Sequence, residues 1–560
     1  MFKNHAHKII VALILVVIVV TNFQTGKFVM GFDNISPYFG IQPILAKTFD
    51  NSARHFVSFN PLVLITPVFS FMRLVGIPPW LISQLFLFGS LIMGVLGAAR
   101  LTESFLIRDK SRGRLGYTLG GLFYLTTLFT YWVFNQPNFL FVAAYASIPW
   151  TIRYLSQIIS VKIGRKTVLS YFRNTSLANK LLHLLVLILF LQTSLNLTAF
   201  VTYTFSIIVI SVVVSKKVHY NVALKRALLF GGIFFLSWFT LLQLELLVSG
   251  NFIFVGSLFL DHITELKGNQ LTDTITEGIR SSGYLRGGIV NTILFAGSWM
   301  EAHDTTNTLL LQSYTLYNKT AVQIMGLIPF IAGMGSLAFL RNGMRNKKLI
   351  IGLVAIMILG IFISSRLFLS ITEHLPYINI ALRWNASKFW PLTVIPLAIL
   401  PSITIVRIYN RINFKGLLLA AVLALQLLYI SPILKGDLFS ELLVNRLPDR
   451  YLLLAESLNN QYKDMRVFYL PTPQIIYMYR YEWGYFGSDF LGYMTNGNLE
   501  SRGVVSYFYN VDEYNSVEEY FAKCELEKIK NVDLIIFDTS LDQDNNCSYS
   551  GGNEPLLINL

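Results

Sequence analysis

Long apolar segments separated by short polar stretches run along most of the chain. A helix needs about 20 mostly apolar residues to cross the roughly 30 Å hydrocarbon core of a bilayer. Segments that approach this length lie at residues 9–22, 80–99, 115–134, 139–158, 181–196, 197–215, 227–249, 321–340, 349–366, 389–406 and 416–434. The pattern predicts an all-α polytopic membrane protein with about eleven transmembrane helices.

The basic residues predict which ends of these helices face the cytoplasm. The chain of 560 residues is 54% hydrophobic, 14% charged and carries a net charge of +14. Six stretches hold 23 of the 45 Lys and Arg residues, at residues 1–8, 100–114, 160–180, 216–226, 341–348 and 407–415. They contain only two acids, Glu103 and Asp109, and alternating the spans from a cytoplasmic N-terminus puts every stretch inside. A single helix over 181–215 would reverse that order, so two spans are expected there. The charge indicates topology in a plasma membrane, not nucleic-acid binding.

The long connections between the predicted helices are expected on the outer face of the membrane. The long connections at residues 23–79, 250–320 and 367–388 all fall outside, whereas the inner connections are short. Residues 61–75 are apolar but too short to span, and they predict a helix lying at the interface. The segment from Ile289 to Trp299 has the same character.

Residues 435–560 predict a separate soluble domain outside the membrane, following a transmembrane part at residues 1–434. Ten Lys and Arg oppose 19 Asp and Glu in this segment. Strands at 466–470 and 532–537 and a helix at 517–529 predict a small α/β unit. Both cysteines of the chain, Cys524 and Cys547, lie there and are available to form one disulfide.

Several enzyme classes lack their signatures in this sequence. No Gly-x-x-x-x-Gly-Lys-Ser/Thr loop and no Gly-x-Gly-x-x-Gly occurs, which disfavours ATP hydrolysis. No His-Glu-x-x-His or Cys-x-x-Cys occurs, which disfavours a zinc protease.

Polar residues of the outer loops are the remaining candidates for chemistry. Asp33 follows the first helix, and Asp50 and His55 lie further along the same loop. A carboxylate at a membrane surface can accept a proton from a hydroxyl, or hold a divalent cation such as Mg²⁺, Mn²⁺ or Ca²⁺. Asp33 could instead cap a helix beginning near Pro37.

A second group of acids lies near the later outer loops. Glu245 falls in the outward half of the seventh span, where a charge usually marks a functional cavity. Snorkelling, or pairing with Arg153 or Arg366, would explain it equally well. The remaining polar cluster could bind a metal or could simply be solvated, and it consists of Glu301, His303 and Asp304.

Two cations and three aromatic residues complete the candidate set. Arg383 and Lys388 precede the tenth span on the outer side, where they could bind a lipid-linked phosphate or snorkel to the interface. Tyr481, Trp483 and Tyr485 could stack on a sugar, although a role in the core or in docking their domain is favoured.

Three short motifs make the chain similar to the GT-C class of glycosyltransferases, and within it to the membrane part of α-(1→3)-arabinofuranosyltransferases. The motifs are Pro61–Val63 with Leu74–Leu81, Asn291–Trp299, and Leu382–Arg383 with Lys388–Phe389 and Pro396–Ala398. The resemblance loosely covers about 400 residues and implies a polyprenyl-phosphate-linked sugar as donor. It implies that Asp33 is the catalytic base and that Arg383 and Lys388 bind donor phosphate. No Asp-x-Asp pair follows the first helix, as it does in many of these enzymes, which leaves metal dependence open.

The resulting hypothesis is a glycosyltransferase acting on an extracytoplasmic glycan, glycolipid or protein. A lipid-linked glycan flippase would also need many spans, but the internal repeats typical of transporters are not evident. A non-catalytic envelope scaffold is the third possibility, and its function would survive Asp33→Asn.

Overall fold

The computed structural model describes residues 2–30, 62–106, 110–160, 173, 175–193, 197–215, 219–248, 289–296, 314–317, 319–340, 347–365, 367–368, 371, 385–470, 479–487, 490–491, 494–495, 499–500, 511–538 and 556–559.

Helices occupy all of the predicted spans. They are α1 (Phe2–Asn22), α4 (Pro79–Leu106), α5 (Lys110–Leu125), α6 (Leu128–Asn135), α7 (Phe139–Ile159), α9 (Leu177–Gln192), α10 (Leu197–Val214), α11 (Tyr220–Val248), α16 (Thr320–Gly335), α17 (Lys347–Ser364), α21 (Pro391–Tyr409), α22 (Lys415–Tyr429) and α23 (Ser431–Leu434). Within the described ranges, 5 helices are long and apolar enough to cross a membrane, at Pro79–Leu106, Tyr220–Thr240, Thr320–Phe339, Lys347–Ser364 and Pro391–Tyr409. The count of about eleven transmembrane helices remains a prediction.

The third predicted span, residues 115–134, is not one helix. It is divided between α5 and α6, because Thr127 leaves the helical conformation and caps α6. Its hydroxyl accepts a hydrogen bond from Thr130 N at 3.3 Å and donates to Tyr124 O at 3.2 Å. Threonine hydroxyls compete with the helical backbone in this way, which the apolar pattern does not reveal.

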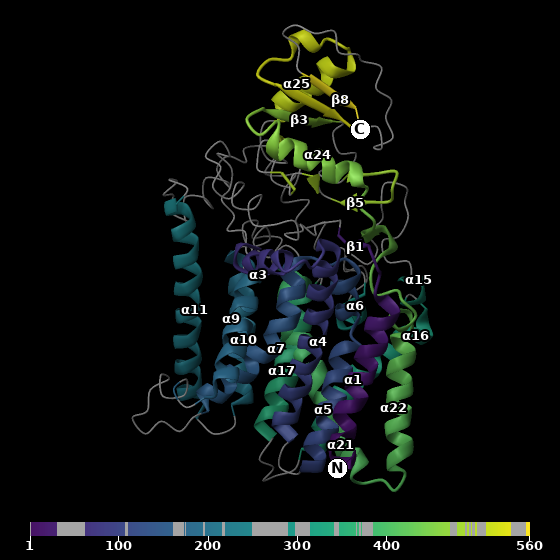
Figure 1. The fold of residues 1–560 in the computed structure, drawn as a ribbon. Helices are drawn as coiled ribbons and strands as arrows, with labels where there is room; N and C mark the ends of the chain where they lie inside the picture. The colour runs from purple at the N-terminus through teal and green to yellow at the C-terminus, as the bar shows by residue number, and fades with distance from the viewer. Residues whose placement is uncertain are drawn as a thin grey trace.

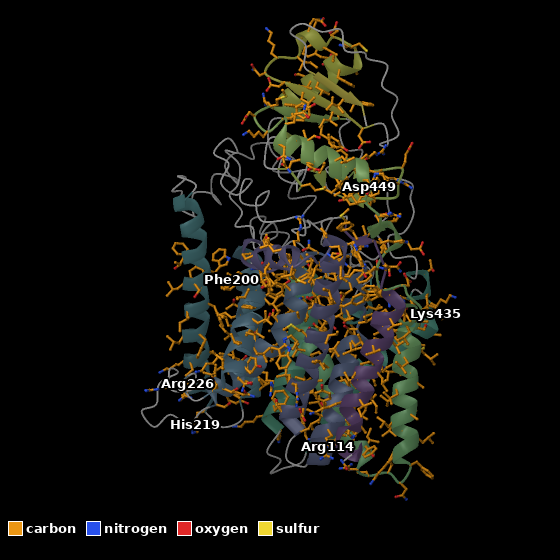
Figure 2. The ribbon with its side chains drawn as sticks, in the orientation of Figure 1. Arg114, Phe200, His219, Arg226, Lys435 and Asp449 are labelled. Carbon is orange, nitrogen blue, oxygen red and sulfur yellow. The ribbon has the colours of Figure 1, made fainter. Side chains whose placement is uncertain are left out.

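The helices run side by side, and the N-terminus lies at one end of the bundle (Figure 1). Figure 2 places Arg114, His219 and Arg226 at this end, which we call the basic end, and the N-terminus lies there too. Lys435 and Asp449 lie toward the other end, which we call the loop end. The separation agrees with the predicted alternation of the spans.

A short helix lies across the loop end of the bundle. This is α3 (Leu62–Leu74), which Figure 1 shows at a steep angle to the helices below it. Ile65 and Phe69 are buried, whereas Phe71 and Leu74 are exposed. The predicted helix at residues 61–75 is therefore confirmed, and the second such segment contains the shorter α14 (Ile289–Leu294).

The C-terminal segment contains a four-stranded parallel sheet with strand order β6-β3-β7-β8. Its strands are β3 (Val467–Leu470), β6 (Leu499–Glu500), β7 (Leu534–Phe537) and β8 (Leu556–Asn559), accompanied by α24 (Asp449–Asn460) and α25 (Val511–Ala522). β3 and β7 are buried along their whole length, as is usual in parallel sheets. Both predicted strands are confirmed, and the predicted helix begins and ends earlier than expected.

Glycines allow the central helices α4 and α7 to approach closely. A Cβ atom on Gly94 would lie 2.8 Å from the backbone oxygen of Tyr145, and one on Gly97 would lie 2.7 Å from the Trp150 indole. Backbone cannot move aside cheaply, so Gly94 is required by the packing. Gly89 belongs to the same helix but has nothing within 4 Å of its Cβ position.

We predict that Gly94→Ala destabilises the bundle by about 1–3 kcal/mol through overpacking. Gly89→Ala is the matched control, and it should be neutral or slightly stabilising because alanine favours a helix over glycine. Thermal unfolding of the two detergent-solubilised variants measures the difference. Equal melting temperatures would contradict the packing described here.

Candidate functional site

The end of α1 is joined to the segment that follows α23 by a buried asparagine. Asn22 is fully buried, and its Nδ2 donates to Ile433 O at 2.7 Å. Its Oδ1 accepts a hydrogen bond from Leu438 N at 2.7 Å. One side chain therefore satisfies backbone groups that would otherwise be buried without partners.

Gln84 of α4 holds the first residues of the first outer loop. Its Oε1 accepts from Gln24 N at 3.0 Å, and its Nε2 donates to Gln24 O at 2.5 Å and Lys27 O at 2.8 Å. Gln84 is itself fully buried. The loop is thus fixed to the bundle immediately after α1.

A small antiparallel sheet completes this attachment. β1 (Phe28–Val29) pairs with β2 (Val444–Asn445), and Met30 N donates to Leu443 O at 2.8 Å. We call the Asn22 and Gln84 hydrogen bonds and this sheet the loop clamp. The clamp fixes the point from which the chain continues toward Asp33.

Lys388 is enclosed by protein near the start of α21. It belongs to α20 (Asn385–Phe389) and is 8% exposed. The neighbouring Ser387 O accepts a hydrogen bond from the Tyr203 hydroxyl of α10 at 3.1 Å. Tyr203 lies six residues after Leu197, so Lys388 lies roughly 9 Å below the start of α10, at the loop end. A charge at this depth is expensive and commonly functional.

Aromatic rings pack beside Lys388. Trp390 is fully buried and stacks on Phe129 of α6, with ring centroids 4.4 Å apart. Phe129 also packs against Phe295, which follows α14, at 5.5 Å. The start of α6, the start of α21 and the residue after α14 therefore meet.

Sequence reasoning missed a second acidic position at this end. The Tyr131 hydroxyl donates to Asp437 Oδ2 at 2.6 Å, and Tyr131 packs against Tyr317 of α15 (Tyr314–Tyr317) at 5.5 Å. Burial raises the pKa of Tyr317 well above its ordinary value, and the nearby Tyr429 and Asp437 raise it further. In the sequence, Asp437 is the first acidic residue after the last apolar segment, residues 416–434.

The sequence pattern also does not indicate two buried amide side chains. Asn135 ends α6 and Gln192 ends α9, and they are 1% and 0% exposed. Within the part of the chain that the structure describes, neither amide group has a hydrogen-bond partner. Such groups are costly unless a ligand or water satisfies them.

Most of the predicted site residues lie outside the described residues. These are Asp33, Asp50, His55, Glu301, His303, Asp304 and Arg383. The described residues contain no group of three His, Cys, Asp or Glu able to hold a metal ion. Of the proposed phosphate-binding pair, only Lys388 is placed.

The predicted alternative pairing of Glu245 with Arg153 stays a prediction, because the side chain of Glu245 lies outside those that the structure describes. Arg226, near the start of α11, donates from Nη1 to Ile159 O at the end of α7 at 2.6 Å, so these two points lie together. With a rise of 1.5 Å per residue, Glu245 lies roughly 28 Å along α11 from Arg226, whereas Arg153 lies about 9 Å from Ile159. Arg366, the other predicted partner, is outside the described residues.

Tyr481, Trp483 and Tyr485 belong to one aromatic cluster in the C-terminal segment. Tyr481 and Tyr485 are each 1% exposed, and the rings of all three pack against one another. The same apolar cluster includes Phe28 and Met30 of the loop clamp region, with Trp80 of α4 packed against it. The packing supports the favoured role in core and docking, and sugar stacking stays a prediction.

A buried carboxylate organises these tyrosines. Asp538, at the end of β7, is fully buried, and its Oδ2 accepts hydrogen bonds from Tyr451 and Tyr469, both at 2.6 Å. Burial raises the pKa of Tyr469 well above its ordinary value, with further contributions from Tyr481 and Asp538. Tyr469 therefore remains a hydrogen-bond donor.

One of the two cysteines is placed by the structure. Cys524 is disulfide-bonded. Cys547, the only other cysteine of the sequence, lies outside the described residues.

The fold is similar to that of a known membrane glycosyltransferase. A structure of the arabinofuranosyltransferase AftD from mycobacteria matches 96% of this chain with a TM-score of 0.53 and 13% identity. A structure of an AftD mutant matches 96% with a TM-score of 0.55 and 13% identity. This chain covers only 35% and 37% of those two chains, so it spans about a third of their length.

A weaker likeness extends to an oligosaccharyltransferase. The structure of AglB from Archaeoglobus fulgidus matches 97% of this chain and 70% of its own, with 11% identity and a TM-score of 0.43. No model of a known protein family matches the chain. No curated protein sequence matches it either.

The likeness to AftD confirms the predicted GT-C resemblance at the level of the fold. Together with the apolar helices, it identifies a multi-pass membrane protein.

Gln84→Leu should release the first outer loop, because it removes the partners of three backbone groups. Each buried group left unsatisfied costs about 1–3 kcal/mol. We expect a protease to cleave the variant faster than the wild type in the loop that follows residues 23–30. Mass spectrometry of the fragments identifies the cleavage sites. Gln323→Leu on α16 is a control of the same chemistry, and equal cleavage of both variants would contradict the clamp.

Proposed function

We propose that this protein is a glycosyltransferase that moves a sugar from a polyprenyl-phosphate donor to an acceptor on a cell-envelope glycan, glycolipid or protein. The observation that carries the proposal is the fold likeness to AftD over 96% of the chain. The buried Lys388 at the loop end adds a cation of the kind that a donor phosphate requires.

The loop end is proposed to face away from the cytoplasm. Basic residues are retained on the cytoplasmic side during insertion, and here they mark the opposite end (Figure 2). The N-terminus is then cytoplasmic, the membrane is the plasma membrane, and residues 435–560 form an extracytoplasmic domain. The donor arrives already activated, so no nucleotide site is needed inside.

In the proposed reaction, Asp33 removes the proton from an acceptor hydroxyl. The acceptor oxygen attacks the anomeric carbon of the sugar, and the bond from that carbon to the phosphate oxygen breaks. Lys388 and Arg383 stabilise the charge on the departing polyprenyl phosphate. In this proposal Asp33 acts close to the loop clamp, because Met30 is held there and three residues of chain reach at most about 11 Å.

The test is an assay of the full-length protein in lipid nanodiscs with a panel of radiolabelled polyprenyl-phosphate pentoses and hexoses. Because the outer acids could hold Mg²⁺, Mn²⁺ or Ca²⁺, each donor is tested with each metal and with a chelator. We expect release of polyprenyl phosphate and transfer of label with at least one donor. Movement of an intact donor across the bilayer without cleavage would favour a flippase instead.

Single substitutions, assayed with the donor that gives transfer, test the proposed roles of Asp33 and Lys388. Asp33→Asn should lower kcat at least about a hundredfold through loss of the base. Lys388→Gln should lower kcat/KM by about a hundredfold through loss of phosphate stabilisation. Lys435→Gln, an exposed lysine at the same end, is the matched control and should retain activity. Full activity of Asp33→Asn would contradict the mechanism.

A further inference from the structure

Cations at the basic end lie repeatedly over aromatic rings. Measured from the charged group to the ring centroid, the pairs are Arg100 over Tyr117 at 5.3 Å, Lys348 over Tyr220 at 5.7 Å, Arg407 over Phe339 at 5.9 Å, Arg411 over Phe339 at 5.0 Å and Lys415 over Tyr409 at 5.8 Å. Such contacts hold a flexible cation in one place. Two of these cations share a single ring.

Arg407 and Arg411 lie on one side of the end of α21. Arg407 lies in the last turn of α21 and Arg411 lies just after its end, and both stand over Phe339, the last residue of the 3-10 turn at Ser336–Phe339. Two guanidinium groups held beside each other repel. An anion bound between them would relieve that repulsion.

The two arginines differ in their partners. Arg407 is half-buried and donates from Nη1 to Phe339 O at 3.2 Å, so it also caps the end of the 3-10 turn. Arg411 is exposed, and among the described residues its guanidinium makes no hydrogen bond or ion pair. Arg411 is therefore a positioned cation whose five N–H donors remain available.

The surroundings of Arg411 combine positive charge with exposed apolar surface. Lys415 follows four residues later, and Phe414 and Leu417 beside it are 74% and 70% exposed. The basic stretches of the sequence contain only two acids, of which Glu103 is already paired with Arg100 at 2.9 Å. A ligand with an anionic head and an apolar body fits this surface better than a soluble anion.

We propose that Arg411, with Arg407 and Lys415, binds the headgroup phosphate of an anionic phospholipid at the basic end. Phe414 and Leu417 lie where the acyl chains would run. Basic sites between transmembrane helices are suited to such headgroups, and each cation contributes about fivefold in affinity. The site is at the opposite end from the proposed glycosyltransferase site and does not depend on it.

The test titrates the detergent-solubilised full-length protein with phosphatidylglycerol or phosphatidylcholine and counts bound lipid by native mass spectrometry. Arg411→Gln removes the positioned cation, whereas Arg411→Lys keeps the positive charge but removes the planar guanidinium group and its five N–H donors. Arg466→Gln is the matched control, because Arg466 lies over Phe468 at 5.2 Å in the C-terminal segment, away from the basic end. Circular dichroism verifies that each variant is folded.

We expect the wild type to bind phosphatidylglycerol several-fold more tightly than phosphatidylcholine. Arg411→Gln should weaken phosphatidylglycerol binding by roughly fivefold, Arg411→Lys should weaken it less, and Arg466→Gln should have no effect. Equal binding of the two lipids, or an unchanged Arg411→Gln variant, would overturn the proposal. Competition by millimolar inorganic phosphate would also overturn it, since the site would then recognise a soluble anion.

Discussion

The architecture depends on satisfying backbone polar groups where the chain leaves the helical bundle. Near hydrocarbon, an unpaired N–H or C=O group is costly, so an irregular segment can be held there only by specific partners. Asn22 and Gln84 supply five of those hydrogen bonds between them to backbone groups of residues 24, 27, 433 and 438. The loop clamp thereby joins the first helix, the first outer loop and the segment after the last helix.

The clamp also connects the bundle to the C-terminal segment. Phe28 and Met30 extend from it into the apolar cluster that contains Tyr481 and Tyr485. That cluster is held in turn by Asp538 through the tyrosine hydroxyls. The first outer loop therefore begins between two packed bodies, and this is the end where Lys388 is buried. Among the described residues, the basic end carries cations that lie over aromatic rings.

Periodicity and charge predicted the parts of this fold that depend on local composition. The helical segments, the interfacial α3 and the strands β3 and β7 follow from apolar runs that the sequence displays directly. The division of the third span at Thr127 depends on a hydroxyl bonding to backbone, which the apolar pattern does not indicate. The bond from Leu438 N to Asn22 joins residues 416 positions apart, and no pattern in a single sequence indicates it. Asp437 was likewise counted only among the acids of the C-terminal segment.

In the proposed function, the polyprenyl phosphate of the donor binds at the loop end, beside Lys388 and the first outer loop. Photo-crosslinking with a polyprenyl phosphate that carries a diazirine next to the phosphate tests it most directly, with the labelled peptides identified by mass spectrometry. We expect label within residues 385–391 and in the peptides around Met30, and less label in Lys388→Gln. Label confined to the basic end, around residues 407–415, would contradict it.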